Sequence, residues 1–136
     1  MSSGLLVLRH RAWWLAIARI GVALIIVLSL VRMPDVGVHV PEGDKIGHML
    51  AYACVMAWYA LLCATPGALW WRAAALLALG IALEFAQSRT GYRSFDVRDM
   101  LADAFGIALG AALWFTPWRH VLVRLEHWMA TRASRA

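Results

Sequence analysis

The sequence predicts an all-α integral membrane protein, a bundle of four transmembrane helices followed by an amphipathic interfacial helix. Of its 136 residues, 62% are hydrophobic and 15% are charged, whereas a soluble domain is about 45–50% apolar. Four long apolar stretches alternate with short polar breaks, and a helix needs about 20 apolar residues to cross a bilayer. Length and composition predict one domain over residues 1–136 and exclude a disordered chain.

The four predicted spans are residues 12–31, 46–65, 69–85 and 100–116. The breaks between them contain Pro34, then Pro66 with Gly67, then a polar stretch over residues 88–99, all typical of turns and helix caps. Basic residues precede the first span, as in a signal peptide, but no small-residue cleavage site follows before Arg32. We therefore expect an uncleaved first helix.

Tryptophan and charge predict the orientation in the membrane. Six tryptophans fall at helix ends that would share one face, where indole rings prefer to lie: Trp13, Trp14, Trp70, Trp71, Trp114 and Trp118. The same face holds seven arginines: Arg9, Arg11, Arg72, Arg119, Arg124, Arg132 and Arg135. The opposite face holds five basic residues: Arg32, Lys45, Arg89, Arg93 and Arg98. This bias favours both termini in the cytoplasm, and Arg19, inside the first span, is expected to snorkel to that face.

The interfacial helix is predicted over residues 118–130. Its apolar residues repeat at helical spacing: Trp118, Val121, Leu122, Leu125, Trp128 and Met129. Arginines surround them, which favours a position on an anionic membrane surface over docking to a soluble partner helix. We expect the lipid bilayer as the main partner. Nucleic acid is not expected, because Lys and Arg lie between long apolar blocks and not on one exposed face.

The unusual polar residues gather at the opposite, outer ends of the helices. They are Asp44, Lys45, His48, Tyr52, Glu84, Gln87, Arg93, Asp96, Asp99 and Asp103. Spacings of four residues place Asp44, His48 and Tyr52 on one helix face, and Asp96, Asp99 and Asp103 share a face of the fourth helix. The sequence therefore predicts a polar pocket at this end.

Several of these residues also have structural explanations. Asp96 and Asp44 are well placed to cap helices, and that interpretation is favoured for both. Lys45 is expected to anchor its helix at the interface. His48 is either a hydrogen-bonded structural histidine or a catalytic or ligand-binding one. For Glu84, structural pairing and function are equally supported.

Asp103 needs a different explanation. It follows Asp96 by seven residues and therefore lies about 10 Å further into the membrane, where a carboxylate costs up to a few kcal/mol. We expect it to be protonated, paired with Arg93 or a charged His48, or exposed to a water-filled cleft.

Gly106 and Gly110 form a G-x-x-x-G step, which lets another helix backbone approach closely. Packing within the chain is favoured over an oligomer formed through these glycines. No metal site or other cofactor is expected, because neither H-x-x-x-H nor a cysteine pair accompanies His48.

Together these motifs resemble the VanZ-like family of small bacterial membrane proteins over about residues 44–110. The resemblance is carried by Asp44-Lys45-Ile-Gly-His48-x-x-x-Tyr52, Glu84-x-x-Gln87 and Arg93-Ser-Phe-Asp96-x-x-Asp99-x-x-x-Asp103-x-x-Gly106-x-x-x-Gly110. The family often has Asn where this chain has Asp103. Its namesake is associated with low-level teicoplanin resistance, so the resemblance implies a role in the cell envelope.

Three functions fit these residues. The first is binding of, or action on, a lipid-linked envelope precursor or a glycopeptide. In it His48, Glu84, Asp99 and Asp103 are candidate catalytic groups. The candidate ligand-binding residues are Asp44, Lys45, Tyr52, Gln87, Arg93 and Asp96. Whether the protein is an enzyme stays open, because no nucleophile motif is present.

The second function is a small proton-coupled transporter, since intramembrane carboxylates such as Glu84 and Asp103 are common in proton relays. The clustering of the acids near one face speaks against it. The third is a non-catalytic factor that modulates another envelope protein, with the polar residues serving as a buried stabilising network.

Overall fold

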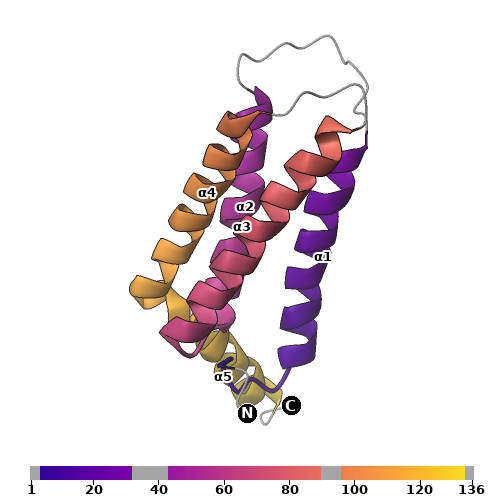
Figure 1. Cartoon of the computed structure of the whole chain (residues 1–136). Helices are drawn as coiled ribbons and strands as arrows, with labels where there is room; N and C mark the ends of the chain where they lie inside the picture. Colours follow the sequence, from indigo (N-terminus) through magenta and orange to yellow (C-terminus); the bar gives the residue numbers. More distant parts are fainter. Residues whose placement is uncertain (1–3, 32–42, 90–95, 134–136) are drawn as a thin grey trace.

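The computed structural model describes residues 4–31, 43–89 and 96–133, and these form a helical bundle (Figure 1). The helices are α1 (Arg11–Leu30), α2 (Gly43–Leu62), α3 (Pro66–Ser88), α4 (Val97–Ala112) and α5 (Val121–Ala133). Two short 3-10 helices, η1 (Leu113–Phe115) and η2 (Pro117–His120), connect α4 to α5. The first and last described residues lie at the same end of the bundle. We call this the termini end.

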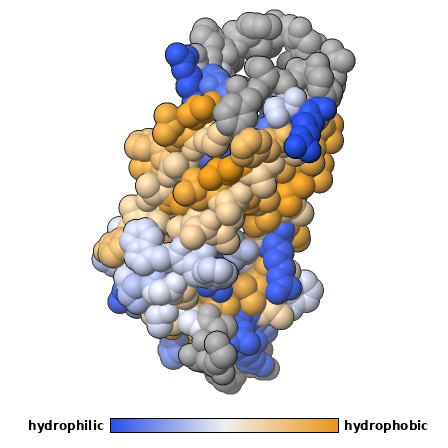
Figure 2. Space-filling view, in the orientation of Figure 1, coloured by the Kyte–Doolittle hydropathy of each residue, from blue (hydrophilic) through white to orange (hydrophobic). Residues whose placement is uncertain are grey.

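Three helices are long and apolar enough to cross a membrane by themselves: α1, residues Lys45–Leu62 of α2, and α3. Residues Val97–Phe115 and Pro117–Ala133 reach that threshold only as a pair, bent by 72°. Figure 2 shows hydrophobic residues gathered over the body of the bundle and more hydrophilic ones toward the termini end. The chain is therefore an all-α membrane bundle, and the fourth predicted span falls on α4 and η1.

Local chemistry sets the helix starts. The Thr65 hydroxyl accepts a hydrogen bond from the backbone N–H of Ala68 at 3.3 Å, and Pro66 occupies the first turn of α3. The same arrangement recurs where the chain bends. Thr116 accepts a hydrogen bond from the Trp118 N–H, and Pro117 starts η2. Because a new helix starts here, the apolar helix α4 does not continue, and α5 runs in a different direction.

Helices α2 and α4 touch through their backbones. A Cβ on Gly106 would collide with the carbonyl oxygen of Met49, and one on Gly110 would lie 2.5 Å from the carbonyl oxygen of Ala53. Both glycines are buried. The close approach that the G-x-x-x-G spacing predicts is therefore made within the chain, and it fixes the α4 carboxylates beside α2.

Helix α5 packs against α1 and α2 at the termini end of the bundle. Leu122 is buried in a cluster with Ala18, Leu61 and Leu62. Glu126 accepts hydrogen bonds from the backbone N–H groups of Arg9 and His10 at 2.6 and 2.8 Å, and from the indole of Trp14 at 2.9 Å. The helix predicted over residues 118–130 is divided in the structure, because η2 takes residues 117–120 and α5 runs from Val121 to Ala133. Helix α5 also packs against its own bundle.

Candidate functional site at the polar end

The site lies where α2 and α4 begin and α3 ends, which we call the polar end. Of the ten predicted site residues, eight have described side chains that lie at this end. They form the polar-end cluster: Lys45, His48, Tyr52, Glu84, Gln87, Asp96, Asp99 and Asp103. Asp44 lies in the first turn of α2, but its side chain is outside the described part of the structure, as is the whole of Arg93.

His48 and Asp103 form a largely buried hydrogen-bonded pair in the cluster. The His48 Nδ1 atom lies 3.1 Å from Asp103 Oδ1, and the two side chains are only 12% and 4% exposed. A hydrogen bond between an imidazole nitrogen and a carboxylate oxygen holds the imidazole in one orientation. The pairing that the depth of Asp103 predicts is therefore made with His48.

The Tyr52 hydroxyl lies beside the same carboxylate. Tyr52 is 1% exposed, and its hydroxyl has no hydrogen-bond partner among the residues that the structure describes. A Cβ added to Gly80 of α3 would lie 2.6 Å from Asp103 Oδ2 and 3.1 Å from the Tyr52 hydroxyl oxygen. Gly80 thus leaves the space in which both polar groups face α3. A buried hydroxyl without a partner is costly, so a polar group that came within hydrogen-bond distance of it would be stabilised.

Lys45 connects α2 to the start of α4. Its Nζ atom lies 3.4 Å from Asp96 Oδ2 and 3.9 Å from Asp99 Oδ1. Asp96 also caps α4 by accepting a hydrogen bond from the Arg98 N–H at 2.9 Å. That backbone hydrogen bond, followed by the hydrogen bond and charge of Lys45, holds the pKa of Asp96 below its ordinary value. Asp96 is therefore an ionised, partly exposed carboxylate.

Glu84 ties α3 to α4. It is 3% exposed, and its Oε1 atom accepts a hydrogen bond from the Asp96 backbone N–H at 2.6 Å. The bond is made to the N-cap of α4, where free N–H groups favour a carboxylate. Glu84 thus positions the helix that carries Asp99 and Asp103.

Gln87 ties α3 to α1. Its side-chain amide donates a hydrogen bond of 2.7 Å to the Ser29 carbonyl oxygen, and both residues are buried. Ser29 lies in the last turn of α1, where helix carbonyls lack intrahelical partners. This bond satisfies one of them. Gln87 therefore contributes to the packing of α1 at the polar end.

The cluster has two layers with different chemistry. The outer layer, Lys45, Glu84, Gln87 and Asp96, joins the helices to one another. The inner layer, His48, Tyr52 and Asp103, brings an imidazole, a phenol and a carboxylate together at low exposure, and Asp99 lies between the layers. Imidazole, phenol and carboxyl groups are side chains that serve as proton donors and acceptors in other proteins. In the described ranges, no group of three or more His, Cys, Asp or Glu side chains is arranged to hold a metal ion.

Two contributors to the site were not predicted. Gly80 makes room for Asp103 and Tyr52, and an isolated glycine in an apolar helix is the only sequence signal for such a role. Ser29 contributes through its backbone carbonyl, so its side chain gave no signal at all.

Comparison with known proteins identifies one family. A family model described as VanZ/LLP1 matches residues 7–122. The matched region runs from the segment before α1 to the start of α5 and includes the whole polar-end cluster. No curated protein and no solved structure matches the chain.

Proposed function

Because this chain belongs to the VanZ/LLP1 family, we propose that it is a cell-envelope protein that binds or acts on a ligand at the polar end of its bundle. The ligand class is a lipid-linked envelope precursor or a glycopeptide, and the expected phenotype is low-level tolerance to teicoplanin. In this proposal the protein lies in the bacterial cytoplasmic membrane with both termini in the cytoplasm. The polar end then faces outward.

The observation that carries the proposal is the buried pair of His48 and Asp103 beside the Tyr52 hydroxyl. A stabilising network needs every polar group satisfied, because an unpaired buried hydroxyl costs about 1–3 kcal/mol. A ligand group or a water molecule between Tyr52 and Asp103 would recover that cost. The inner layer thus has the character of a site prepared for a polar group.

The residues take different roles in this proposal. His48 gives or takes a proton, and Asp103 holds its imidazole and stabilises the charged form. Lys45 attracts an anionic part of the ligand, while Asp96 and Asp99 attract a cationic part. Glu84 is a positioning residue because it holds the start of α4. The contributions of Asp44, Gln87 and Arg93 to ligand binding are part of the same proposal.

The test is teicoplanin susceptibility of a sensitive host that expresses the wild type or single variants at equal membrane abundance. His48→Gln and Asp103→Asn remove proton exchange but keep polar side chains of similar shape. Gly47→Ala is the matched control, because a Cβ at this exposed position of α2 meets nothing within 4 Å. We expect protection by the wild type and Gly47→Ala and its loss in His48→Gln. Absence of protection by the wild type would contradict the proposed phenotype.

Asp103→Asn separates charge from shape. Asn often occupies this position in the family that the sequence resembles, so a protective Asn variant would show that the site works without the carboxylate. In that case the negative charge of Asp103 is not needed for protection, and an amide at this position can hold His48 as well.

A second candidate is a non-catalytic envelope factor, and the outer layer of the cluster favours it. Glu84 and Gln87 both make buried hydrogen bonds to backbone groups of other helices. Removing one partner from such a bond costs about 1–3 kcal/mol. If stability is the whole role of the cluster, every variant that loses protection should also lose abundance or thermal stability. Normal abundance without protection would exclude this candidate.

A further inference from the structure

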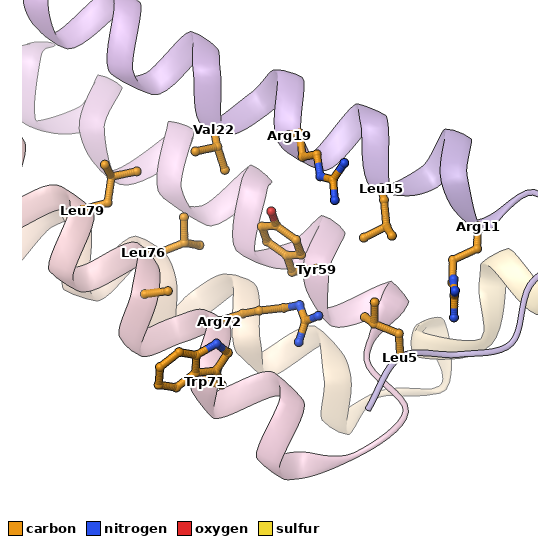
Figure 3. A pocket seen from close by; sticks show the side chains of 11 residues that line it. Leu5, Arg11, Leu15, Arg19, Val22, Tyr59, Trp71, Arg72, Leu76 and Leu79 are labelled. Carbon is orange, nitrogen blue, oxygen red and sulfur yellow. The ribbon is translucent and has the colours of Figure 1, made fainter. Parts of the chain in front are cut away.

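A groove with a volume of about 490 Å³ lies between α1 and α3, near the termini end and away from the polar-end cluster. Figure 3 shows Arg19 of α1 and Arg72 of α3 on either side of Tyr59, which α2 contributes. The volume falls within the range of about 300–1,000 Å³ that is typical of small-ligand sites. The function proposed above does not use this groove.

Three arginines line the groove: Arg11, Arg19 and Arg72. Arg72 donates a hydrogen bond to the Ala68 carbonyl at 2.9 Å, and its guanidinium lies 5.7 Å from the centre of the Tyr59 ring. Across the described ranges, none of the three guanidinium groups forms an ion pair with a carboxylate. Three positive charges therefore face one apolar-walled space without a negative partner, and their complement is an anion.

The level of these charges in the membrane matches a lipid headgroup. Trp13 and Trp71 are both highly exposed, and exposed tryptophans mark the boundary between hydrocarbon and water. Arg11 and Arg72 are their close neighbours in sequence, at the same end of the bundle. Arg19 follows Arg11 by eight residues and so lies about 12 Å further along α1. A phosphate between these arginines would lie at headgroup depth.

The rest of the groove suits an acyl chain. Val22, Leu76 and Leu79 continue its lining from Arg19 and Arg72 toward the middle of the bundle, and Figure 3 shows these aliphatic side chains on the side away from Arg11. The arginines thus lie near the membrane surface and the aliphatic side chains lie deeper. A phospholipid has the same arrangement, with its phosphate at the surface and its acyl chains below. A guanidinium binds phosphate oxygens through two parallel hydrogen bonds, which adds geometric fit to charge.

We propose that this groove binds an anionic phospholipid, with the phosphate held by the three arginines and one acyl chain between α1 and α3. The site is independent of the ligand proposed for the polar end. In the predicted orientation it takes its lipid from the cytoplasmic leaflet.

Native mass spectrometry of the purified full chain in detergent tests this proposal. The probes are phosphatidylglycerol, phosphatidylcholine and inorganic phosphate. We expect phosphatidylglycerol to bind at least about tenfold more tightly than phosphatidylcholine. Both lipids carry the phosphate, but the choline group adds a positive charge that the three arginines repel, whereas the glycerol group is neutral. Arg19→Gln should weaken phosphatidylglycerol binding about tenfold, and Arg19→Lys should weaken it less.

Two further variants separate a lipid site from general surface charge. Ala75→Phe narrows the groove without changing charge and should also weaken phosphatidylglycerol binding. Arg124→Gln removes an exposed arginine of α5 outside the groove and should leave binding unchanged. If Arg19→Gln cannot be purified in folded form, Ala75→Phe and Arg11→Gln test the proposal in its place. Both should then weaken phosphatidylglycerol binding.

Three results would overturn the proposal. They are equal binding of the two lipids, an equal loss in Arg124→Gln and Arg19→Gln, and binding of inorganic phosphate as tight as that of phosphatidylglycerol. The last result would show that the arginines bind a free anion and not a lipid.

Discussion

A single carboxylate, Asp103, organises the inner layer of the polar-end cluster. Its two oxygens face different neighbours, Oδ1 toward His48 and Oδ2 toward the space beside Gly80 and Tyr52. A charge so far along a spanning helix is tolerated only with partners. Its depth could be read from the sequence, because a seven-residue spacing fixes distance along a helix. The role of Gly80 could not be read from the sequence, because it depends on how α3 packs against α2 and α4.

Replacing Gly80 with alanine tests how tightly these groups are packed. The new Cβ would lie 2.6 Å from Asp103 Oδ2, so the carboxylate or α3 must move. We expect a loss of about 1–3 kcal/mol in the free energy of unfolding, as in other overpacked sites. Thermal unfolding of the purified protein measures the loss.

The control for this substitution is Gly47→Ala, where the added Cβ meets open space. It should stabilise the protein by about 0.5–1 kcal/mol, because alanine restricts the unfolded chain more than glycine does. A Gly80→Ala protein as stable as the wild type would show that the carboxylate has room to withdraw.

At the level of helices, α4 and α5 differ in how much the sequence reveals. The start of α4 is predictable, since Asp96 before an apolar run is a capping signal and the structure shows the cap. The position of α5 against the bundle is not predictable from the sequence. Its amphipathic spacing predicts an apolar face, but the partners of Glu126 are backbone groups more than 110 residues earlier in the chain. Backbone groups carry no sequence signature, so such a contact appears only in the fold.

Glu126→Gln tests whether α5 holds the start of α1. The amide keeps the shape but has one acceptor oxygen in place of two, so one of the two backbone N–H groups loses its partner. We expect a destabilisation of about 0.5–1.5 kcal/mol, because water can replace the lost acceptor at this exposed position, and faster amide hydrogen exchange over residues 9–14. Hydrogen exchange followed by mass spectrometry locates the change. His127→Gln, at an exposed neighbouring position, should leave exchange as in the wild type.

The whole molecule has two chemically different ends. Acidic groups predominate in the polar-end cluster, whereas arginines and exposed tryptophans gather at the termini end. The sequence predicts this division well, since it depends only on which helix ends share a face. It does not predict the groove, because the distance between α1 and α3 is set by packing.

The predicted orientation follows from the same division. Seven basic residues at the termini end against five at the other favour both termini in the cytoplasm. We expect a green fluorescent protein fused to the C-terminus to fluoresce and an alkaline phosphatase fused at the same position to be inactive. An active phosphatase fusion would place the termini outside and reverse the sidedness of both proposed sites.

The bond between Glu126 and the start of α1 also has a consequence for biosynthesis. A ribosome makes α1 before α5, so α1 enters the membrane before Glu126 can bind the residues that precede this helix. The N–H groups of Arg9 and His10 must rely on water until Glu126 is translated. Synthesis of α5 is then also the step that secures the segment before α1. In a chain truncated before α5, the segment before α1 would therefore lose the side chain that anchors it.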